Sequence, residues 1–254
     1  MNLSGKVLAV TGSDGALGQA VAAALAGYGA KLALLTHARE IAGVQPAGAV
    51  HYGGIDLTQE AAARAALERV VKEAGRLDGL INVAGAFRFE KMSGGTLDSW
   101  DSMYKINLRT AVIACQAALP YLLQSGGGRI VNVGAMAAAK ATAGMGPYAA
   151  SKAGVAQLTE ALADELKDQR ITVNAVLPST LDTPKNRLDM PQADFTRWVT
   201  PAQAADLDFE QQVTNASLAW SDFQGRELME LIAEVDVIAR QIPEAAQLGA
   251  SAAP

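Results

Sequence analysis

The sequence predicts an α/β fold built on a doubly wound parallel sheet of about six strands, with helices on both faces. Two observations carry this prediction. Short apolar runs alternate along the chain with helical stretches of roughly ten or more residues, which is the pattern of βαβ units. A cluster of glycines, residues 12–18, separates the first apolar run from the first helix. Because the connections that cross over between parallel strands are right-handed, these βαβ units favour the strand order 3-2-1-4-5-6.

The expected strands are short and rich in Val, Ile and Leu, as buried parallel strands are. They cover residues 6–11, 31–36, 50–55, 77–83, 129–133 and 171–177. Helices are expected from the glycine cluster to residue 28, over 58–74 with Thr58 as its cap, over 98–121, and from 146 to 167. Pro120 marks an expected interruption of the third helix.

The bulk composition describes a globular chain. Of its 254 residues, 50% are hydrophobic and 19% are charged, enough for one large α/β domain with a core. The net charge of −5 and the lack of a basic block argue against nucleic acid or an anionic membrane as partner. No apolar run approaches about 18 residues, and no signal peptide is recognised, so we expect a cytoplasmic protein. The single cysteine, Cys115, is expected to be a buried apolar residue.

Tyr148 and Lys152 are the central candidates for catalysis. They are four residues apart, so on a helix they share one face. A lysine ammonium beside a phenol is expected to lower the pKa of the phenol. The pair is therefore a candidate general acid for a carbonyl-like oxygen or nitrogen.

The glycine cluster has the context of a dinucleotide-binding turn in a Rossmann-type fold. Gly12 permits the tight turn, Gly15 permits close approach of a pyrophosphate, and Gly18 permits the helix to pack against the strand. The first turn of the helix supplies N–H donors for phosphate. The alternative is a strand–turn–helix that binds no nucleotide.

The adenosine end of the predicted site favours NADPH weakly over NADH. Thr36 ends the second strand, where NAD-binding versions place a carboxylate for the ribose hydroxyls. His37 and Arg39 follow and are candidates to meet a 2′-phosphate, although both also fit a solvated loop. Asp56 is a candidate acceptor for the adenine amino group, or a turn residue before the next helix. We expect His51 to be a strand residue without function, and we find no metal-ligand cluster.

Several motifs occur together in an order and spacing that resemble a known superfamily. They are Thr11-Gly12 with Gly15 and Gly18, Asn82-Val83-Ala84-Gly85, Asn107, Tyr148-x-x-x-Lys152 and Asn174-x-x-x-Pro178. Jointly they resemble the short-chain dehydrogenase/reductase superfamily over about residues 5–200. Within it the chain looks most similar to the quinonoid dihydropteridine reductase branch. That closer resemblance rests on Gly15-Ala16-Leu17-Gly18, Gly134-Ala135-Met136-Ala137-Ala138, Ala143-Gly144-Met145 and LPSTLDTPKNRLDMPQADFTRW at residues 177–198.

The resemblance implies hydride transfer between a nicotinamide and a small substrate. It implies that Tyr148 protonates the substrate, that Lys152 holds the nicotinamide ribose and lowers the pKa of the tyrosine, and that Asn107 supports a proton-relay water. The implied substrate side is formed by Ala135, Tyr148 and Trp198. The implied cofactor residues are Gly12, Ser13, Gly15, Ala16, Leu17, Gly18, Thr36, His37, Asp56, Leu57, Asn82, Ala84, Gly85, Lys152, Pro178 and Thr183.

The sequence departs from the superfamily pattern in three places. Ala135 occupies the position of the usual substrate-orienting serine, as it does in dihydropteridine reductases. Thr36 replaces the acid that those enzymes usually carry at the end of the second strand. The final segment shows no last strand and no Gly-Gly ending; instead, residues 206–247 read as helical with one apolar face. That helix is expected either to pack on its own domain or to pair with another subunit, and residues 249–254 to form a mobile tail.

These observations lead to one domain over residues 1–200, extended by a helical segment over 201–254. The expected function is NAD(P)H-dependent reduction of a small carbonyl or imine-like molecule, with a quinonoid dihydropterin as the most specific candidate. Two alternatives stay open: an ordinary ketone or alcohol dehydrogenase of the same fold, and a catalytically degenerate scaffold that binds nucleotide or a partner. By resemblance, helices 98–124 and 146–168 form a subunit seam, so a homodimer or homotetramer is expected.

Overall fold

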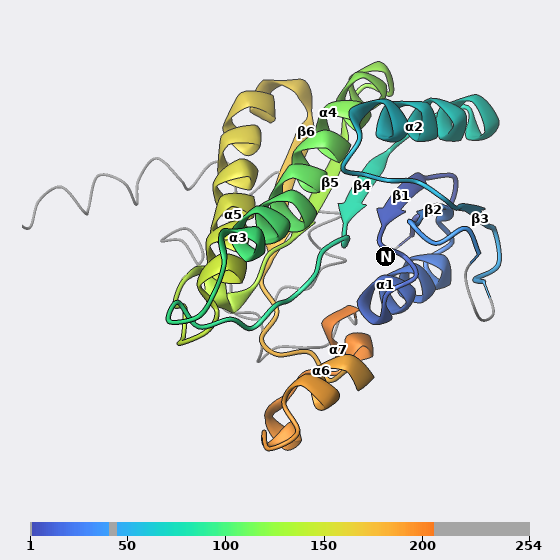
Figure 1. The fold of residues 1–254 in the computed structure, drawn as a ribbon. Helices are drawn as coiled ribbons and strands as arrows, with labels where there is room; N and C mark the ends of the chain where they lie inside the picture. The colour runs from blue at the N-terminus through green and yellow to red at the C-terminus, as the bar shows by residue number, and fades with distance from the viewer. Residues whose placement is uncertain (1, 41–44, 206–254) are drawn as a thin grey trace, which may run out of the picture.

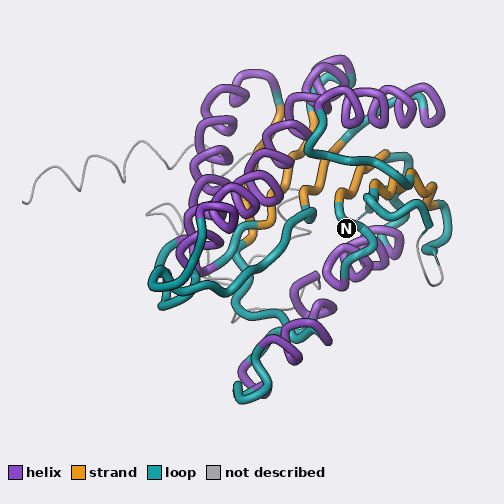
Figure 2. Tube along the Cα trace, in the orientation of Figure 1, coloured by secondary structure: helices purple, strands orange, loops and turns teal. Residues whose placement is uncertain are grey.

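The computed structural model describes residues 2–40 and 45–205, which form a central sheet with helices on both faces (Figures 1 and 2). Its strands are β1 (Val7–Thr11), β2 (Lys31–Leu35), β3 (Ala49–Tyr52), β4 (Gly79–Asn82), β5 (Gly128–Val133) and β6 (Ile171–Val176). All neighbouring strands pair in parallel, in the order β3-β2-β1-β4-β5-β6. This confirms the predicted fold class and strand order.

The helices follow the predicted alternation with the strands. They are α1 (Ala16–Gly27), α2 (Glu60–Ala74), α3 (Leu97–Met103), α4 (Thr110–Gln124), α5 (Gly146–Leu166), α6 (Pro184–Asp189) and α7 (Pro201–Ala205). A π-helical segment, η1 (Tyr104–Arg109), joins α3 to α4, and Pro120 lies inside α4 without ending it. Shorter turns are η2 (Met136–Ala138), η3 (Lys167–Gln169) and η4 (Phe195–Arg197). The predicted C-terminal helix over 206–247, and the tail after it, lie outside the described residues.

The sheet divides the core into two layers. In β1, Val7 and Ala9 pack with buried residues of α2 and α4, whereas Leu8 and Val10 pack on the opposite face with residues of α1. This division follows from the alternation of side chains along a strand. Helix α7 packs against α1, where Ala205 is 1% exposed. Figure 1 shows α2 and α4 on one side of the sheet and α1 with α7 on the other.

One helical stretch is long and apolar enough to cross a membrane by length and composition. It runs over Leu97–Gln124 and covers α3, η1 and α4. The stretch is not an unbroken apolar run, because charged residues such as Asp101, Lys105 and Arg109 interrupt it, so the expectation that no apolar run approaches about 18 residues is not contradicted. Half of the most apolar window is buried inside the fold, and residues of α4 such as Ile113 and Leu122 belong to the core under the sheet. In this structure the stretch is a core helix.

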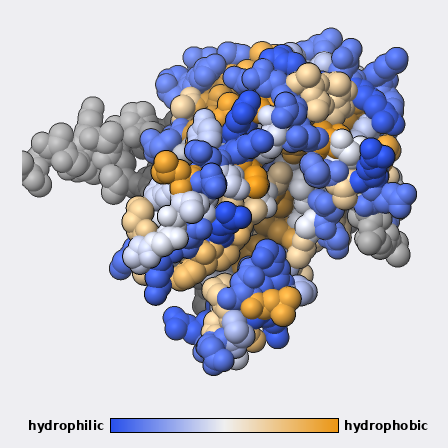
Figure 3. Space-filling model, in the orientation of Figure 1, coloured by the Kyte–Doolittle hydropathy of each residue, from blue (hydrophilic) through white to orange (hydrophobic). Residues whose placement is uncertain are grey.

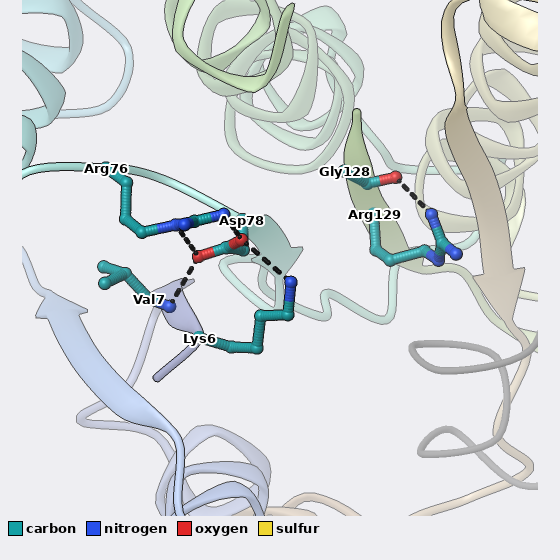
Figure 4. Close-up of polar contacts among 6 residues, drawn as sticks. All are labelled: Lys6, Val7, Arg76, Asp78, Gly128 and Arg129. Atoms are coloured by element: carbon teal, nitrogen blue, oxygen red, sulfur yellow. Dashed lines mark hydrogen bonds and ion pairs between the residues drawn. The ribbon is translucent and has the colours of Figure 1, made fainter. Parts of the chain in front are cut away.

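A buried carboxylate joins the starts of two neighbouring strands at the amino-terminal edge of the sheet (Figure 4). Asp78 accepts hydrogen bonds from the Val7 main-chain N–H at 2.9 Å, from Lys6 Nζ at 3.3 Å and from Arg76 Nε at 2.8 Å. Burial by itself raises the pKa of Asp78, but the hydrogen bonds from Arg76, Val7 and Lys6 together outweigh burial and lower it. This contact holds β1 and β4 in register at the edge opposite the candidate site.

Candidate active site

The predicted catalytic pair lies near the carboxyl end of β5. Tyr148 and Lys152 are one turn apart in α5, whose first turn contains Pro147, a residue whose fixed φ suits that position. Lys152 is only 5% exposed, and its Nζ donates a 2.7 Å hydrogen bond to the main-chain carbonyl of Val133, the last residue of β5. The helix therefore directs the lysine to the edge where ligands bind in open α/β sheets.

The protonation of the pair differs from the sequence-based expectation. Burial raises the pKa of Tyr148 to about 12 and lowers the pKa of Lys152 to about 8. The prediction that Lys152 lowers the pKa of Tyr148 is therefore wrong for this structure, in which the ammonium is bonded to Val133 and burial governs the phenol. A phenol with a raised pKa holds its proton at neutral pH, but it is a weaker acid than a donor whose pKa lies near the operating pH.

Asn107 lies in the π-helical segment η1 and is 1% exposed. Its Oδ1 accepts from the Ala86 N–H at 2.7 Å, and its Nδ2 donates to the Ala86 carbonyl at 3.0 Å and to Ser151 Oγ at 2.9 Å. Ser151 Oγ in turn donates to the Tyr148 carbonyl at 2.7 Å. The Asn107 amide thus ties the loop after β4 to the helix that carries Tyr148. Ser151 was not singled out from the sequence, although it stands inside the Tyr-x-x-x-Lys motif.

Gly85 lies between two of the predicted catalytic side chains. A Cβ on this residue would stand 2.7 Å from Asn107 Oδ1 and 3.3 Å from Lys152 Nζ. Only glycine therefore lets the chain pass between them without displacing either. The neighbouring Ala84 is fixed by its N–H, which donates to Thr11 Oγ1 at the end of β1 at 3.2 Å.

Asn82 was predicted to line the adenosine path, but its side chain is turned into the core. Its Nδ2 donates to Asn132 Oδ1 at 2.9 Å and lies 3.3 Å from Cys115 Sγ. Cys115 is 3% exposed, and burial raises the pKa of its thiol to about 12. The buried, inert cysteine is as expected, whereas Asn82 can reach a nucleotide only through its main chain.

The glycine turn has the close backbone packing and the exposed backbone that a dinucleotide-binding turn needs. Gly12 has φ +62°, and a Cβ there would lie 2.7 Å from the Ala84 Cα, while a Cβ on Gly18 would collide with the Gly12 carbonyl oxygen. The exposed Gly15 has only that carbonyl nearby, at 3.4 Å from a built Cβ, so the backbone is open to a close ligand. Ser13 is 1% exposed, and its Oγ has no hydrogen-bond partner among the described residues.

The start of α1 adds N–H donors to this turn. Gly15 is the N-cap residue and makes no side-chain cap, and the first turn holds no acidic residue, so its amides are not satisfied by a side chain. Ala16 is exposed in this turn, whereas Leu17 is buried in the core and can contribute only its main chain. These residues fit the pyrophosphate of a dinucleotide.

At the adenosine end, the Thr36 hydroxyl is already used inside the protein. Thr36 is 1% exposed; its Oγ1 donates to the Ala38 carbonyl at 2.8 Å and lies 2.7 Å from His51 Nε2. Because the hydroxyl has a single proton, it accepts its second hydrogen bond from His51. His51 therefore fixes the turn after β2, a role that its position in a strand did not reveal. His37, next in the chain, is exposed.

Asp56 forms the turn before α2, and its carboxylate accepts two hydrogen bonds from Thr58. Its Oδ1 accepts from Thr58 N at 2.9 Å and Thr58 Oγ1 at 2.7 Å, so Thr58 is not the helix cap that was expected; α2 begins after Gln59. These hydrogen bonds lower the pKa of Asp56, against desolvation, and the charges of His37 and Lys105 lower it further. Leu57, predicted as a cofactor residue, is buried in the core. Lys105 was missed because its helix is far away in sequence.

The segment after β6 forms a separate small lobe beside the site. Pro178 is buried, and its carbonyl accepts from the Met136 N–H at 3.1 Å. Thr183 caps α6 by accepting from the Asn186 N–H at 3.1 Å, which uses a lone pair of its hydroxyl and leaves the O–H able to donate. Trp198 packs on Phe195, with ring centroids 4.7 Å apart. Figure 3 shows a hollow between this lobe and the body of the molecule, with apolar residues on its floor.

The base of this lobe is closed by main-chain hydrogen bonds. The Asp182 N–H donates to the Val199 carbonyl at 2.7 Å, and the Val199 N–H donates to the Thr180 carbonyl at 3.0 Å. Ala135, the residue predicted to face substrate, lies at the start of η2 and is 6% exposed. The predicted residues thus fall into two groups: a catalytic and substrate end near α5, and an adenosine end near β2 and β3. An extended dinucleotide joins such ends.

Comparison with known proteins agrees with this geometry. The family model described as short chain dehydrogenase matches residues 6–193. D-threitol dehydrogenase of Mycolicibacterium smegmatis is 35% identical over 207 residues, 78% of this chain and 80% of the relative. The chain belongs to the short chain dehydrogenases. This membership makes it an NAD(P)-dependent oxidoreductase.

Other short chain dehydrogenases show the same likeness in sequence and structure. The 3-oxoacyl-(acyl-carrier-protein) reductase of Thermotoga maritima is 33% identical over 192 residues, 72% of this chain and 77% of that protein. The crystal structure of NAD+-bound xylitol dehydrogenase superposes with a TM-score of 0.72 at 26% identity, covering 81% of this chain and 91% of that one. The fold and the family are therefore established together.

Proposed function

We propose that this short chain dehydrogenase reduces a small carbonyl or imine-like molecule, and that a quinonoid dihydropterin is its most specific candidate substrate. The observation that carries the choice is Ala135, a buried methyl where the superfamily pattern places a hydrogen-bond donor to substrate. The loop at residues 177–198, which resembles that of dihydropteridine reductases, supports the same choice. This finer assignment rests on resemblance and on the chemistry of one position.

In the proposed reaction a reduced nicotinamide supplies the hydride. Tyr148 supplies the proton from its Oη to the atom of the substrate that gains electrons. Lys152 supplies a positive charge and N–H donors one turn away on the same helix. Asn107 holds the loop after β4 against α5, and Gly85 leaves room for the two side chains beside it. The relay water expected at Asn107 stays a prediction. The side-chain Oδ1 and Nδ2 of Asn107 are both bonded to protein groups.

The methyl of Ala135 discriminates between substrate classes. A ketone develops negative charge on oxygen as hydride arrives, and removing one donor to such an oxyanion costs roughly 3–4 kcal/mol of transition-state stabilisation. A substrate whose accepting atom is protonated as it is reduced, such as the imine-like nitrogen of a quinonoid dihydropterin, depends less on that donor. Ala135 therefore favours the second class.

For the cofactor we place NADPH ahead of NADH. Thr36 provides no carboxylate at the end of β2, and its hydroxyl is bonded to Ala38 and His51. His37 and Arg39 are exposed beside it, and the positive charge of Lys105 acts on Asp56. A 2′-phosphate is favoured by such cations. An equal affinity for both cofactors, or a preference for NADH, would contradict this choice.

An ordinary alcohol dehydrogenase is the second candidate, favoured by the relatives. D-threitol dehydrogenase and the probable galactose dehydrogenase of Rhizobium meliloti, the latter 31% identical over 223 residues, are named for hydroxyl-bearing substrates. We further propose a cytoplasmic homodimer or homotetramer, on the resemblance of helices 98–124 and 146–168 to a subunit seam; molar mass in solution tests this.

A substrate panel tests the proposal. Purified wild-type protein and an Ala135→Ser variant are assayed with both cofactors against quinonoid dihydropterin, simple ketones and sugar alcohols. We expect wild-type turnover on the dihydropterin, and a gain on ketones in the variant that approaches about 10²-fold. Strong wild-type activity on ketones or polyols with none on the dihydropterin would favour the second candidate. Cofactor binding without turnover on any of these classes would contradict the proposed substrate class.

A further inference from the structure

Phe87 lies edge-on against the ring of Tyr148. The two ring centroids are 5.0 Å apart and the ring planes meet at 84°, which is the T-shaped geometry that aromatic pairs prefer. Both side chains are partly buried. Phe87 comes from the loop after β4, so this contact joins two segments that are about 60 residues apart in the sequence.

The orientation of the Tyr148 ring depends on packing. No hydrogen bond to the Tyr148 hydroxyl is found within residues 2–40 and 45–205. The polar contacts of this turn of α5 are made by its neighbours instead: Ser151 bonds the Tyr148 main chain, and Lys152 bonds the Val133 carbonyl. The direction in which the phenol points is therefore set by what touches its ring.

The loop that carries Phe87 is held on both sides of this residue. Before it, both the N–H and the carbonyl of Ala86 are bonded to the Asn107 side chain. After it, the Glu90 N–H donates to the Gly144 carbonyl at 2.8 Å, and the Glu90 carboxylate accepts from Ser99 Oγ at 2.6 Å. The segment from Ala86 to Glu90 is thus bonded to η1 at one end, and to α3 and the residues just before α5 at the other, which keeps Phe87 beside Tyr148.

We propose that Phe87 is a positioning residue for the reduction, which holds the ring of Tyr148 in place and keeps water from one side of the phenol. The proposal deepens the function proposed above and rests on the role given there to Tyr148. Phe87 itself exchanges no proton and no hydride. It acts by restricting the ring from which the proton leaves, because a proton is transferred efficiently only from a donor held within hydrogen-bond reach of its acceptor.

Three variants of the full chain separate this role from a general effect on the loop. Phe87→Ala removes the ring, Phe87→Tyr keeps it, and Phe89→Ala removes an aromatic residue of the same loop that packs on Gly144 and is 56% exposed. We expect kcat to fall about tenfold in Phe87→Ala, with cofactor affinity unchanged. Phe87→Tyr is expected to restore kcat, and Phe89→Ala to leave it within about twofold of wild type.

A second readout does not require turnover. The ionisation of Tyr148 is followed by ultraviolet absorbance up to about pH 11, as the difference between each protein and its Tyr148→Phe counterpart. Because burial raises the pKa of Tyr148 to about 12, we expect no titration of this group in wild type. In Phe87→Ala water reaches the phenol, and titration is expected to appear near the ordinary value of about 10.

Two results would overturn the proposal. One is a Phe87→Ala protein with the kcat and the Tyr148 titration of wild type. The other is equal loss of kcat in Phe87→Ala and Phe89→Ala, which would show a general requirement for an intact loop. If instead Tyr148→Phe proves fully active, the proposed function fails while the titration still reports whether Phe87 shields the phenol.

Discussion

Replacing Gly85 with alanine adds one methyl at the centre of the site. The built Cβ stands 2.7 Å from Asn107 Oδ1, well inside ordinary contact distance, and 3.3 Å from Lys152 Nζ. Gly85 has no left-handed φ, so the backbone accepts alanine and the effect is purely steric. Neither neighbour moves freely, because Asn107 makes hydrogen bonds to Ala86 and Ser151, and Lys152 is bonded to Val133.

The size of the effect follows from this packing. Relieving the contact requires a shift of about half an ångström or more, and overpacking of this kind costs roughly 1–3 kcal/mol of unfolding free energy. A displacement near 1 Å at a catalytic constellation lowers the rate by about 10²-fold. We therefore expect Gly85→Ala to be moderately destabilised and to lose kcat by one to two orders of magnitude.

Urea unfolding and steady-state kinetics on the same preparations measure both effects. Gly27→Ala is the matched control, because a Cβ at Gly27, in the last turn of α1, meets nothing within 4 Å. This control is expected to keep kcat and to gain up to about 1 kcal/mol in stability. A Gly85→Ala enzyme with wild-type kcat and stability would refute the geometry described for Asn107 and Lys152.

Three further outcomes are expected from the same structure. Gly18→Ala should weaken cofactor affinity by more than about tenfold, since its Cβ meets the Gly12 carbonyl; unchanged affinity in a fluorescence titration would contradict the close packing of this turn. Asp78→Asn should lower the free energy of unfolding by about 1–3 kcal/mol near neutral pH. Because the folded pKa of Asp78 is lowered, this difference from wild type should shrink as pH falls below about 4. The stability of wild type should rise relative to that of Lys152→Met between about pH 8 and 10.5, because burial lowers the folded pKa of Lys152 to about 8 and the unfolded chain binds the extra proton in that range. Urea unfolding at several pH values measures the stability differences for Asp78→Asn and for Lys152→Met. A difference that does not change with pH would contradict the corresponding prediction.

The fold could be predicted because the signals that specify it are local. Each strand is a short apolar run followed by a helix of suitable length, and right-handed crossovers leave few layouts for such units. The errors arose where tertiary contacts override a local pattern. Thr58 has the residue type of a helix N-cap, but its hydroxyl donates a hydrogen bond to Asp56, and α2 starts after Gln59.

The site could be predicted only as a set of residue types. The spacing of Tyr148 and Lys152 indicates a shared helix face, but it does not show that burial dominates both pKa values. Phe87 and Lys105 lie far from their partners in sequence, and no motif marks them. The internal bonding of Thr36 to His51 joins two different strands. Such pairings come from the folded sheet, and a linear pattern carries no signal for them.

The central claim is that Tyr148 gives the proton in a nicotinamide-dependent reduction. Its most direct test compares wild type and Tyr148→Phe in two assays: fluorescence titration with NADPH and NADH, and turnover of quinonoid dihydropterin. The account predicts micromolar binding of at least one cofactor to both proteins, and turnover that falls by about 10²-fold or more only in the variant. Full turnover by Tyr148→Phe, or no binding of either cofactor to wild type, would contradict it.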